Sequence, residues 1–305
     1  MEIQIDITKN KQRLDKVLVK EFTDLSRSQI EHFIKKEGVI IDNQKIVKPS
    51  YKLKEGETVI ANWNLEPETL KPNLKIKLNI LFENNDFIVI NKQAGLSVHP
   101  LRMTDTNTLV NGLIAYNKEL INVGDNPLRP GLVHRLDKDT SGVMLIAKNN
   151  DSFNKLKEMF QNHLIQKTYI ALIYGKMKEH TGEINIPLGK SLQKFNRVKV
   201  DLKNKEDSVE AITRYKVLNE FKETSLLEVY PKTGRTHQIR VHFAALSNFI
   251  IGDREYGSNK INQNFPLSRQ FLHAKKLEFE WNGEKMVFGA DLPGDLQKCL
   301  DYVNL

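Results

Sequence analysis

Residues 129–148 read RPGLVHRLDKDTSGVMLIAK. The apolar run at 143–147 predicts a buried strand, and the Pro, Gly, Thr and Ser residues before it predict a polar loop at its start. Asp137 lies in this loop, two residues after Arg135. A carboxylate held in a loop at the start of a rigid strand can serve as a catalytic group. An Asp in a turn more often caps backbone N–H groups, so the loop alone leaves both interpretations open.

Strand-like segments and amphipathic helices alternate on both sides of this loop. We expect helices near 109–116 and 153–164 because their apolar residues recur with helical spacing. We expect strands at 87–90, 143–147, 168–174, 184–186, 210–217 and 225–230. Hairpin-like and helical connections are mixed. The pattern therefore predicts an α+β fold, with a large mixed, mainly antiparallel sheet flanked by helices.

Residues 12–61 predict a separate small α/β domain. Leu14 opens a first helix, and the Ser26–Gln29 capping box opens a second helix that ends at Gly38. A hairpin is expected to join residues 39–41 to 45–47 through Asp42 and Asn43. Residues 62–74 contain two prolines and no apolar periodicity, which favours a linker. The remaining residues, 75–305, then form the larger domain.

Composition narrows the class of protein and its partners. The chain has 305 residues, 40% of them hydrophobic and 28% charged, as in ordinary globular proteins of two domains. Its single cysteine, Cys299, excludes an internal disulfide and a cysteine-based zinc site. No apolar run reaches the ~18 residues of a membrane span, and the N-terminus lacks the pattern of a secretion signal, so we expect a cytoplasmic protein. The net charge of +8 favours a polyanion, although an anionic membrane surface would also attract it.

Five further segments carry a resemblance to a known family. They are NKQAGLSVHP at 91–100, QKTYIALIYG at 166–175, TGRTHQIRVH at 233–242, GDREYG at 252–257 and RQFLHAKKLEF at 269–279. Together with the HRLD tetrapeptide they resemble the RluA family of pseudouridine synthases, in its RluD-like branch. Residues 12–61 similarly resemble the S4 RNA-binding domain. The resemblance implies an isomerase that converts uridine to pseudouridine in RNA. Such a reaction oxidises nothing and releases no group, so no cofactor or metal is expected.

The resemblance also implies roles for five residues. Asp137 takes the position of the catalytic carboxylate, and Tyr169 that of the active-site tyrosine. Arg235 matches the basic partner that would keep the carboxylate charged in a closed pocket. Leu272 matches the apolar residue that packs against the base. Arg135 matches the arginine that enters the stack when the uridine flips out.

Basic segments indicate where the RNA backbone would bind. Residues 190–205 contain six Lys or Arg and one Asp, which predicts a loop that grips phosphates through Lys190, Lys194 and Arg197. Residues 9–54 contain 12 Lys or Arg and 6 Asp or Glu. The S4-like RNA contacts expected there come from Arg13, Lys16, Arg27, Lys35 and Lys36. We expect the protein to be a monomer. Its expected partner is structured RNA, above all large-subunit ribosomal RNA or pre-ribosomal particles.

Three alternatives remain open at this point. The S4-like domain and the charge also suit a non-catalytic RNA-binding or ribosome-assembly protein. A pseudouridine synthase acting on transfer RNA would have the same motifs. Asp137 and Asp139 could share a metal ion in a Mg²⁺-dependent nuclease, although no further acidic cluster accompanies them.

Overall fold

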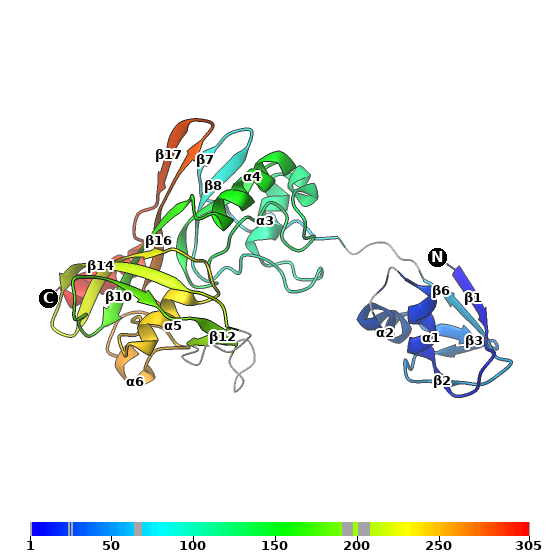
Figure 1. Ribbon diagram of the computed structural model, residues 1–305. Helices are drawn as coiled ribbons and strands as arrows, with labels where there is room; N and C mark the ends of the chain where they lie inside the picture. Colours follow the sequence, from blue (N-terminus) through cyan, green and yellow to red (C-terminus); the bar gives the residue numbers. More distant parts are fainter. Residues whose placement is uncertain are drawn as a thin grey trace. The chain divides into compact units, whose positions relative to one another are not determined.

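The computed structural model describes residues 2–23, 25, 27–63, 69–190, 198–200 and 208–304 (Figure 1). The chain divides into two compact units, Met1–Glu68 and Thr69–Leu305. Among the described residues, no helix is long and apolar enough to cross a membrane.

The first unit packs two helices against a small antiparallel sheet of strand order β1-β6-β3-β4. Its elements are β1 (Glu2–Asp6), β2 (Gln12–Arg13), α1 (Leu14–Glu21), α2 (Arg27–Lys36), β3 (Val39–Ile41), β4 (Gln44–Ile46), β5 (Lys52–Leu53) and β6 (Thr58–Asn62). The predicted hairpin is present. Asp42 and Asn43 connect β3 to β4 with φ values of 45° and 68°, the left-handed pair that a tight hairpin turn requires.

Both ends of the expected linker 62–74 belong to folded units. Trp63 is fully buried in the first unit, where its ring stacks on Phe33 at 5.3 Å and its Nε1 donates to the carbonyl of Gly38. Leu70 is buried in the second unit against Val110. The first unit also begins earlier than residue 12, because β1 pairs along the whole of β6.

The second unit is built on a large mixed sheet. Nine of its described strands form the order β11-β14-β15-β10-β16-β9-β8-β7, with β17 paired to β16. Among these described strands, β16 and β9 form the only parallel pair, so the expected α+β fold with a mainly antiparallel sheet is confirmed. The strands are β7 (Ile80–Glu83), β8 (Phe87–Lys92), β9 (Ser141–Ala147), β10 (Gln166–Tyr174), β11 (Thr181–Asn185), β14 (Ile212–Glu220), β15 (Thr224–Pro231), β16 (Leu272–Trp281) and β17 (Glu284–Gly289). A separate pair joins β12 (Leu188–Lys190) to β13 (Val198–Val200).

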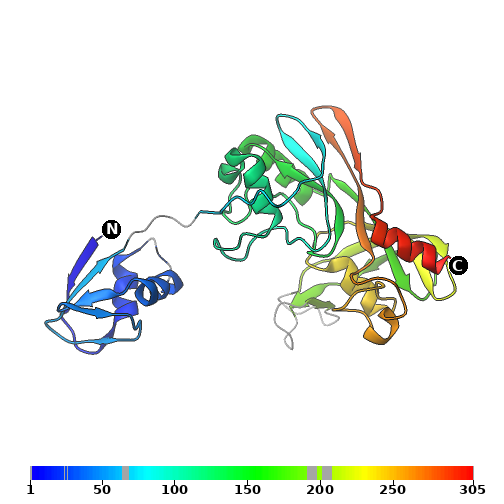
Figure 2. The same ribbon diagram turned by 180° about the vertical axis from the view of Figure 1, so that it is seen from behind.

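Helices cover the two halves of this sheet, and each half has its own large hydrophobic cluster. Their bounds are α3 (Leu109–Tyr116), the 3₁₀ helix η1 (Lys118–Asn122), α4 (Asn150–Gln161), α5 (Gln238–Ala245), α6 (Asn259–Asn262) and α7 (Gly294–Val303). In Figure 1, α3 and α4 lie by β7 and β8, whereas α5 lies by β10 and β14. Helix α7, red in Figure 2, packs Leu296 and Cys299 into the second core. Tyr169 on β10 contacts both cores and therefore marks their junction.

The parallel pairing of β9 with β16 brings distant segments together at this junction. Gly142 of β9 is in register with Ala274 of β16, which in turn pairs with Tyr169 of β10. Gly142 has φ +122°, and a Cβ built on it would lie 2.2 Å from the carbonyl oxygen of Ala274. Only glycine fits so close an approach. The loop that carries Asp137 consequently enters β9 beside Leu272, the first residue of β16.

Candidate active site

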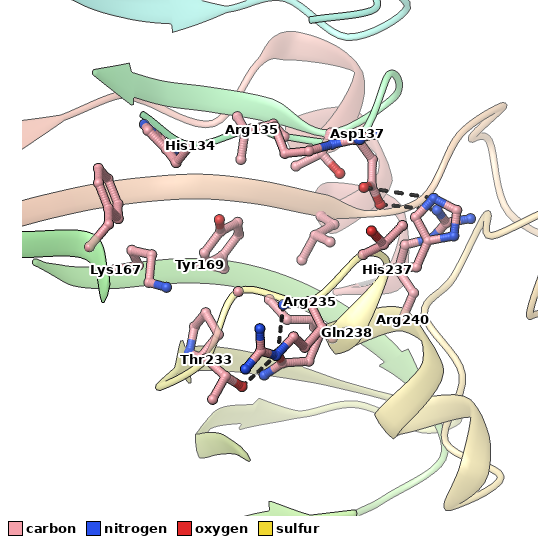
Figure 3. A pocket seen from close by; sticks show the side chains of 18 of the residues that line it. His134, Arg135, Asp137, Lys167, Tyr169, Thr233, Arg235, His237, Gln238 and Arg240 are labelled. Carbon is pink, nitrogen blue, oxygen red and sulfur yellow. Dashed lines mark hydrogen bonds and ion pairs between the residues drawn. The ribbon is translucent and has the colours of Figure 1, made fainter. Parts of the chain in front are cut away.

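A pocket of about 590 Å³ opens at the junction of the two cores (Figure 3). This volume falls within the range of small-molecule and nucleotide sites. Its lining comes from the Asp137 loop, from α4 and the residues after it, from β10, and from the turn between β15 and α5. The residues labelled in Figure 3 are His134, Arg135, Asp137, Lys167, Tyr169, Thr233, Arg235, His237, Gln238 and Arg240.

The Asp137 carboxylate is held by an arginine of α5. Arg240 Nη1 donates to Asp137 Oδ2 at 3.0 Å, and the Asp137 side chain is only 16% exposed. Its second oxygen, Oδ1, lies 3.8 Å from His237 Nε2. Thus the partly buried carboxylate faces a fixed guanidinium, which offsets its desolvation.

Arg240 is itself fixed by other carboxylates. Its Nε and Nη2 donate to the two oxygens of Asp253, at 2.7 and 2.9 Å, and Nη2 also reaches Glu255 Oε2 at 3.1 Å. Burial acts to lower the pKa of Arg240, but its hydrogen bonds to Asp253 and the charges of Asp253 and Asp137 outweigh burial and raise it. Asp253 is fully buried and also accepts from the backbone N–H groups of Glu255 and Tyr256. The guanidinium is therefore a permanent, oriented cation.

The expected ion pair between Arg235 and Asp137 is wrong: Arg240 makes it. Arg235 is exposed, and its Nε donates to the carbonyl oxygen of Glu210 at 3.0 Å. The physical reason is the start of α5. The helix begins at Gln238, whose Oε1 accepts from the backbone N–H of Arg235. Arg235 thus lies in the preceding turn, while Arg240 lies in the first turn of the helix and is buried.

Tyr169 and Leu272 both line the pocket as expected from their motifs. Leu272 is buried at the first position of β16, and Tyr169 stands on the neighbouring strand. Burial, followed by the negative charge of Asp137, raises the pKa of Tyr169 above its usual value. The phenol therefore keeps its proton at neutral pH and can act as a hydrogen-bond donor beside an apolar wall.

His237 was not singled out in the sequence, yet it lies against Asp137. It adopts a left-handed conformation with φ 55° directly before α5, and its Nδ1 is 2.9 Å from the hydroxyl of Tyr256. Burial lowers the pKa of His237, and Asp137 acts in the opposite direction. The neutral ring is consequently the form expected at pH 7.

The two residues at the start of HRLD have different environments. His134 accepts at Nε2 from the backbone N–H of Leu145 and stacks on Phe160 at 4.6 Å. Burial, followed by the charge of Lys167, lowers the pKa of His134 to about 3, so the ring is neutral and supports the loop. Arg135 is exposed at the pocket and also borders a second cavity of about 120 Å³.

Buried cations hold the residues that follow Asp137. Lys92 Nζ donates to the carbonyl oxygens of Lys138, Gln93 and Leu96, at 2.8 to 3.0 Å. Arg269 Nη1 donates to the carbonyl oxygen of Asp139 at 3.0 Å, and its Nε is paired with Asp295 of α7. The loop that carries Asp137 is thus held by Lys92 of β8 and by Arg269, which is itself paired with α7. These contacts preorganise the carboxylate.

The structure describes the side chains of five of the eight residues that were predicted to contact the RNA backbone. The side chain of Lys190, together with Lys194 and Arg197, lies outside the described residues. In the first unit, Arg13 and Arg27 both pair with the buried carboxylate of Asp15, at 2.9 and 2.7 Å. These ion pairs, first the hydrogen bond from Arg13, lower the pKa of Asp15 to about 2. The other three candidates are exposed on α1 and α2: Lys16, Lys35 and Lys36.

Sequence reasoning missed Arg240, Asp253 and Lys167 as site residues. The sequence could have indicated Arg240, because this arginine lies between the apolar residues Ile239 and Val241 on a short helix. A charged side chain among buried residues needs a partner of opposite charge. Asp253 was within the matched GDREYG segment but had no role assigned. Lys167 lines the pocket two residues before Tyr169, and burial lowers its pKa to about 8.

Comparisons with known proteins agree with this geometry. Residues 86–245 match the RNA pseudouridylate synthase family, and residues 12–59 match the S4 domain. An uncharacterized RNA pseudouridine synthase of Aquifex aeolicus is 40% identical over 258 residues, covering 84% of this chain and 80% of the relative. Ribosomal large subunit pseudouridine synthase D of Zymomonas mobilis is 33% identical over 293 residues, covering 93% of this chain and 92% of the relative.

A solved structure shares the fold as well. Human RNA Pseudouridylate Synthase Domain Containing 4 superimposes with a TM-score of 0.59 at 25% identity, covering 74% of this chain and 93% of the human chain. With these matches and an aspartate–arginine pocket in the matched region, the chain belongs to the RNA pseudouridylate synthase family: it is an RluD-like RNA pseudouridine synthase of the RluA family with an N-terminal S4 domain.

Proposed function

We propose that this enzyme isomerises uridines of large-subunit ribosomal RNA, with Asp137 as its catalytic carboxylate. The observation that carries the proposal is the ion pair of Asp137 with Arg240 inside a pocket that also holds Tyr169 and Leu272. The ribosomal target is supported by relatives in Zymomonas mobilis and Vibrio cholerae, both named ribosomal large subunit pseudouridine synthase D, and by the S4 domain.

The reaction breaks the C1′–N1 bond of uridine, turns the base, and joins C5 to C1′. The proton on C5 is lost and N1 gains one, so the overall change is an isomerisation. Asp137 serves this sequence as a nucleophile toward the sugar or the base, or as the anion opposite positive charge that develops on the sugar. Arg240 orients the carboxylate and places a fixed positive charge beside it. Tyr169 stacks on the uracil and offers a protonated hydroxyl for proton transfer, and Leu272 packs against the base.

The two other functions suggested by the sequence receive less support. A non-catalytic RNA-binding function does not explain why a buried arginine holds a partly buried carboxylate in a pocket. A nuclease that shared a metal between Asp137 and Asp139 would need further ligands. Among the described residues, no group of three His, Cys, Asp or Glu side chains is placed to hold a metal ion.

The target is tested by mapping pseudouridines in total RNA from cells with and without this protein. We expect sites in large-subunit ribosomal RNA to disappear, and to return with the wild-type protein but not with Asp137→Asn. Sites lost only from transfer RNA would overturn the ribosomal target while leaving the enzymatic assignment intact.

We expect the S4 unit to supply affinity for structured RNA rather than chemistry. Its exposed lysines Lys16, Lys35 and Lys36 offer phosphate contacts, and none of the pocket residues lies in this unit. Removing residues 1–68 should weaken binding to long ribosomal RNA and flatten its salt dependence, because fewer counterions are released. Binding is measured over a salt series, with a short stem-loop as the control RNA. An unchanged salt slope on the long RNA would contradict this role.

Arg135 is expected to assist base flipping. Its guanidinium is exposed at the pocket, where it can stack in the gap that the extruded uridine leaves. Arg135→Ala should slow modification of a paired uridine by roughly ten- to a hundredfold, since opening a base pair costs a few kcal/mol, and much less for an unpaired one. Single-turnover rates on two RNAs that differ only in this pairing measure the effect. Equal losses on both would assign Arg135 to the chemical step or to the fold.

A further inference from the structure

The side chain of Lys167 lines the pocket, and no described residue supplies a counter-ion for it. Among the described residues, no carboxylate lies within 4.0 Å of its Nζ atom, and burial alone accounts for the lowering of its pKa. An ammonium group that gives up solvation without a partner costs free energy. Such a group at the wall of a binding site is typical of one that meets its anion on the ligand.

Lys167 stands on β10 two residues before Tyr169, and both side chains line the pocket. In Figure 3, Tyr169 lies between Lys167 and the Asp137–Arg240 pair. Two residues along a strand span roughly 7 Å. A nucleotide whose base stacks on Tyr169 can therefore extend its backbone toward Lys167, away from the carboxylate that acts on the base and sugar.

The turn before α5 adds a second cation at the same end of the pocket. Gly234 is so close that a Cβ built on it would lie 3.8 Å from Lys167 Nζ. The next residue, Arg235, is exposed at the pocket and uses only its Nε in the bond to Glu210, which leaves its two terminal nitrogens without a partner among the described residues. By contrast Arg240, at the other end, has its nitrogens occupied by three carboxylates.

We infer that Lys167 and Arg235 form a subsite for a backbone phosphate adjacent to the flipped uridine. This inference rests on the proposed function, because it needs an RNA strand whose target base enters the pocket. An anionic phosphate satisfies the ammonium and the free edge of the guanidinium at once. It also explains why Arg235 is present in the pocket although it does not pair with Asp137. The rival role for Lys167 is proton transfer beside Tyr169.

The experiment replaces one phosphate of the RNA at a time with an uncharged methylphosphonate, on the 5′ and on the 3′ side of the target uridine. The RNA is a stem-loop around a uridine identified by the pseudouridine mapping. Affinity is measured in the Asp137→Asn background, so that binding is read without turnover. If the subsite exists, one of the two replacements should weaken binding about 10- to 100-fold, the size of a charged hydrogen bond.

Lys167→Met should cause a loss of similar size on unmodified RNA, and the same methylphosphonate should then cost little more. Lys167→Arg should restore most of the affinity and the sensitivity to the replacement. Arg235→Met tests the second, exposed residue of the subsite. The loss of affinity from Arg235→Met combined with the methylphosphonate should again be smaller than the sum of the two separate losses. Lys157→Met is the matched control, because Lys157 also lines the pocket but is already paired with Asp125. Its effect should add in full to that of either methylphosphonate.

Full additivity of Lys167→Met and of Arg235→Met with both methylphosphonates would overturn the subsite. So would a Lys167→Met enzyme that binds the RNA normally and loses only its rate, which would assign Lys167 to proton transfer. These results are distinct from a failure of the proposed function, which would appear as a wild-type enzyme that modifies no RNA. A thermal melt of each variant identifies one that fails to fold, and Lys167→Gln then replaces Lys167→Met.

Discussion

Asp137→Asn should abolish pseudouridine formation, by on the order of 10³-fold or more, and leave the fold and the affinity for RNA intact. Removing the group that attacks or stabilises the reacting sugar removes stabilisation of the transition state. The amide has the same shape, and its oxygen can still accept the 3.0 Å hydrogen bond from Arg240. Single-turnover rates and equilibrium binding on the same RNA measure the two effects separately.

The matched control for this variant is Asp139→Asn. Asp139 lies two residues further along the same loop, and Arg269 contacts its backbone carbonyl rather than its carboxylate. Activity should stay within a few-fold of wild type. An Asp137→Asn enzyme within tenfold of wild type would refute the catalytic assignment, and equal losses for both variants would point to the loop as a whole.

Arg240→Met should both destabilise the protein and inactivate it. Asp253 is fully buried and would lose its bidentate partner, and breaking a buried ion pair from one side costs about 3–5 kcal/mol. Asp137 would also lose the cation that offsets its desolvation, so the acid limb of the pH–rate profile should move to higher pH. Thermal unfolding measures the first effect, and rates from pH 5 to 9 measure the second.

Two further variants separate stability from chemistry at this site. Replacing the buried pair together, Arg240→Met with Asp253→Leu, should recover part of the stability but none of the activity, because the fully buried charge of Asp253 is removed with its partner while Asp137 stays without its cation. Arg235→Met is the control. As an exposed substitution it should change the free energy of unfolding by no more than about 0.5 kcal/mol and leave the acid limb in place. If Arg235→Met moved the acid limb and Arg240→Met did not, the ion pair of Asp137 with Arg240 would not be the one that operates in catalysis.

Local elements were predictable because local physics decides them. Helix α3 spans the expected 109–116, and the turn at Asp42 and Asn43 has the two left-handed residues that a short hairpin needs. The ends were less predictable when tertiary contacts set them. Helix α4 ends at Gln161 although the apolar pattern continues to Leu164, and β7 (Ile80–Glu83), which was not expected, forms at the edge of the sheet by pairing with β8.

The family, the α+β class and the loop that carries Asp137 could all be predicted from the sequence. The family and the loop depend on short motifs, and the class depends on the local pattern of apolar residues. The arginine that reaches the carboxylate could not be predicted in this way, because long-range packing selects it. Asp137 and Arg240 are 103 residues apart, and the choice between Arg235 and Arg240 depends on where α5 begins and on the buried Asp253 that fixes Arg240. The position of Lys167 is likewise invisible in the chain, since only the tertiary structure places this lysine of β10 in the pocket, where no described carboxylate pairs with it.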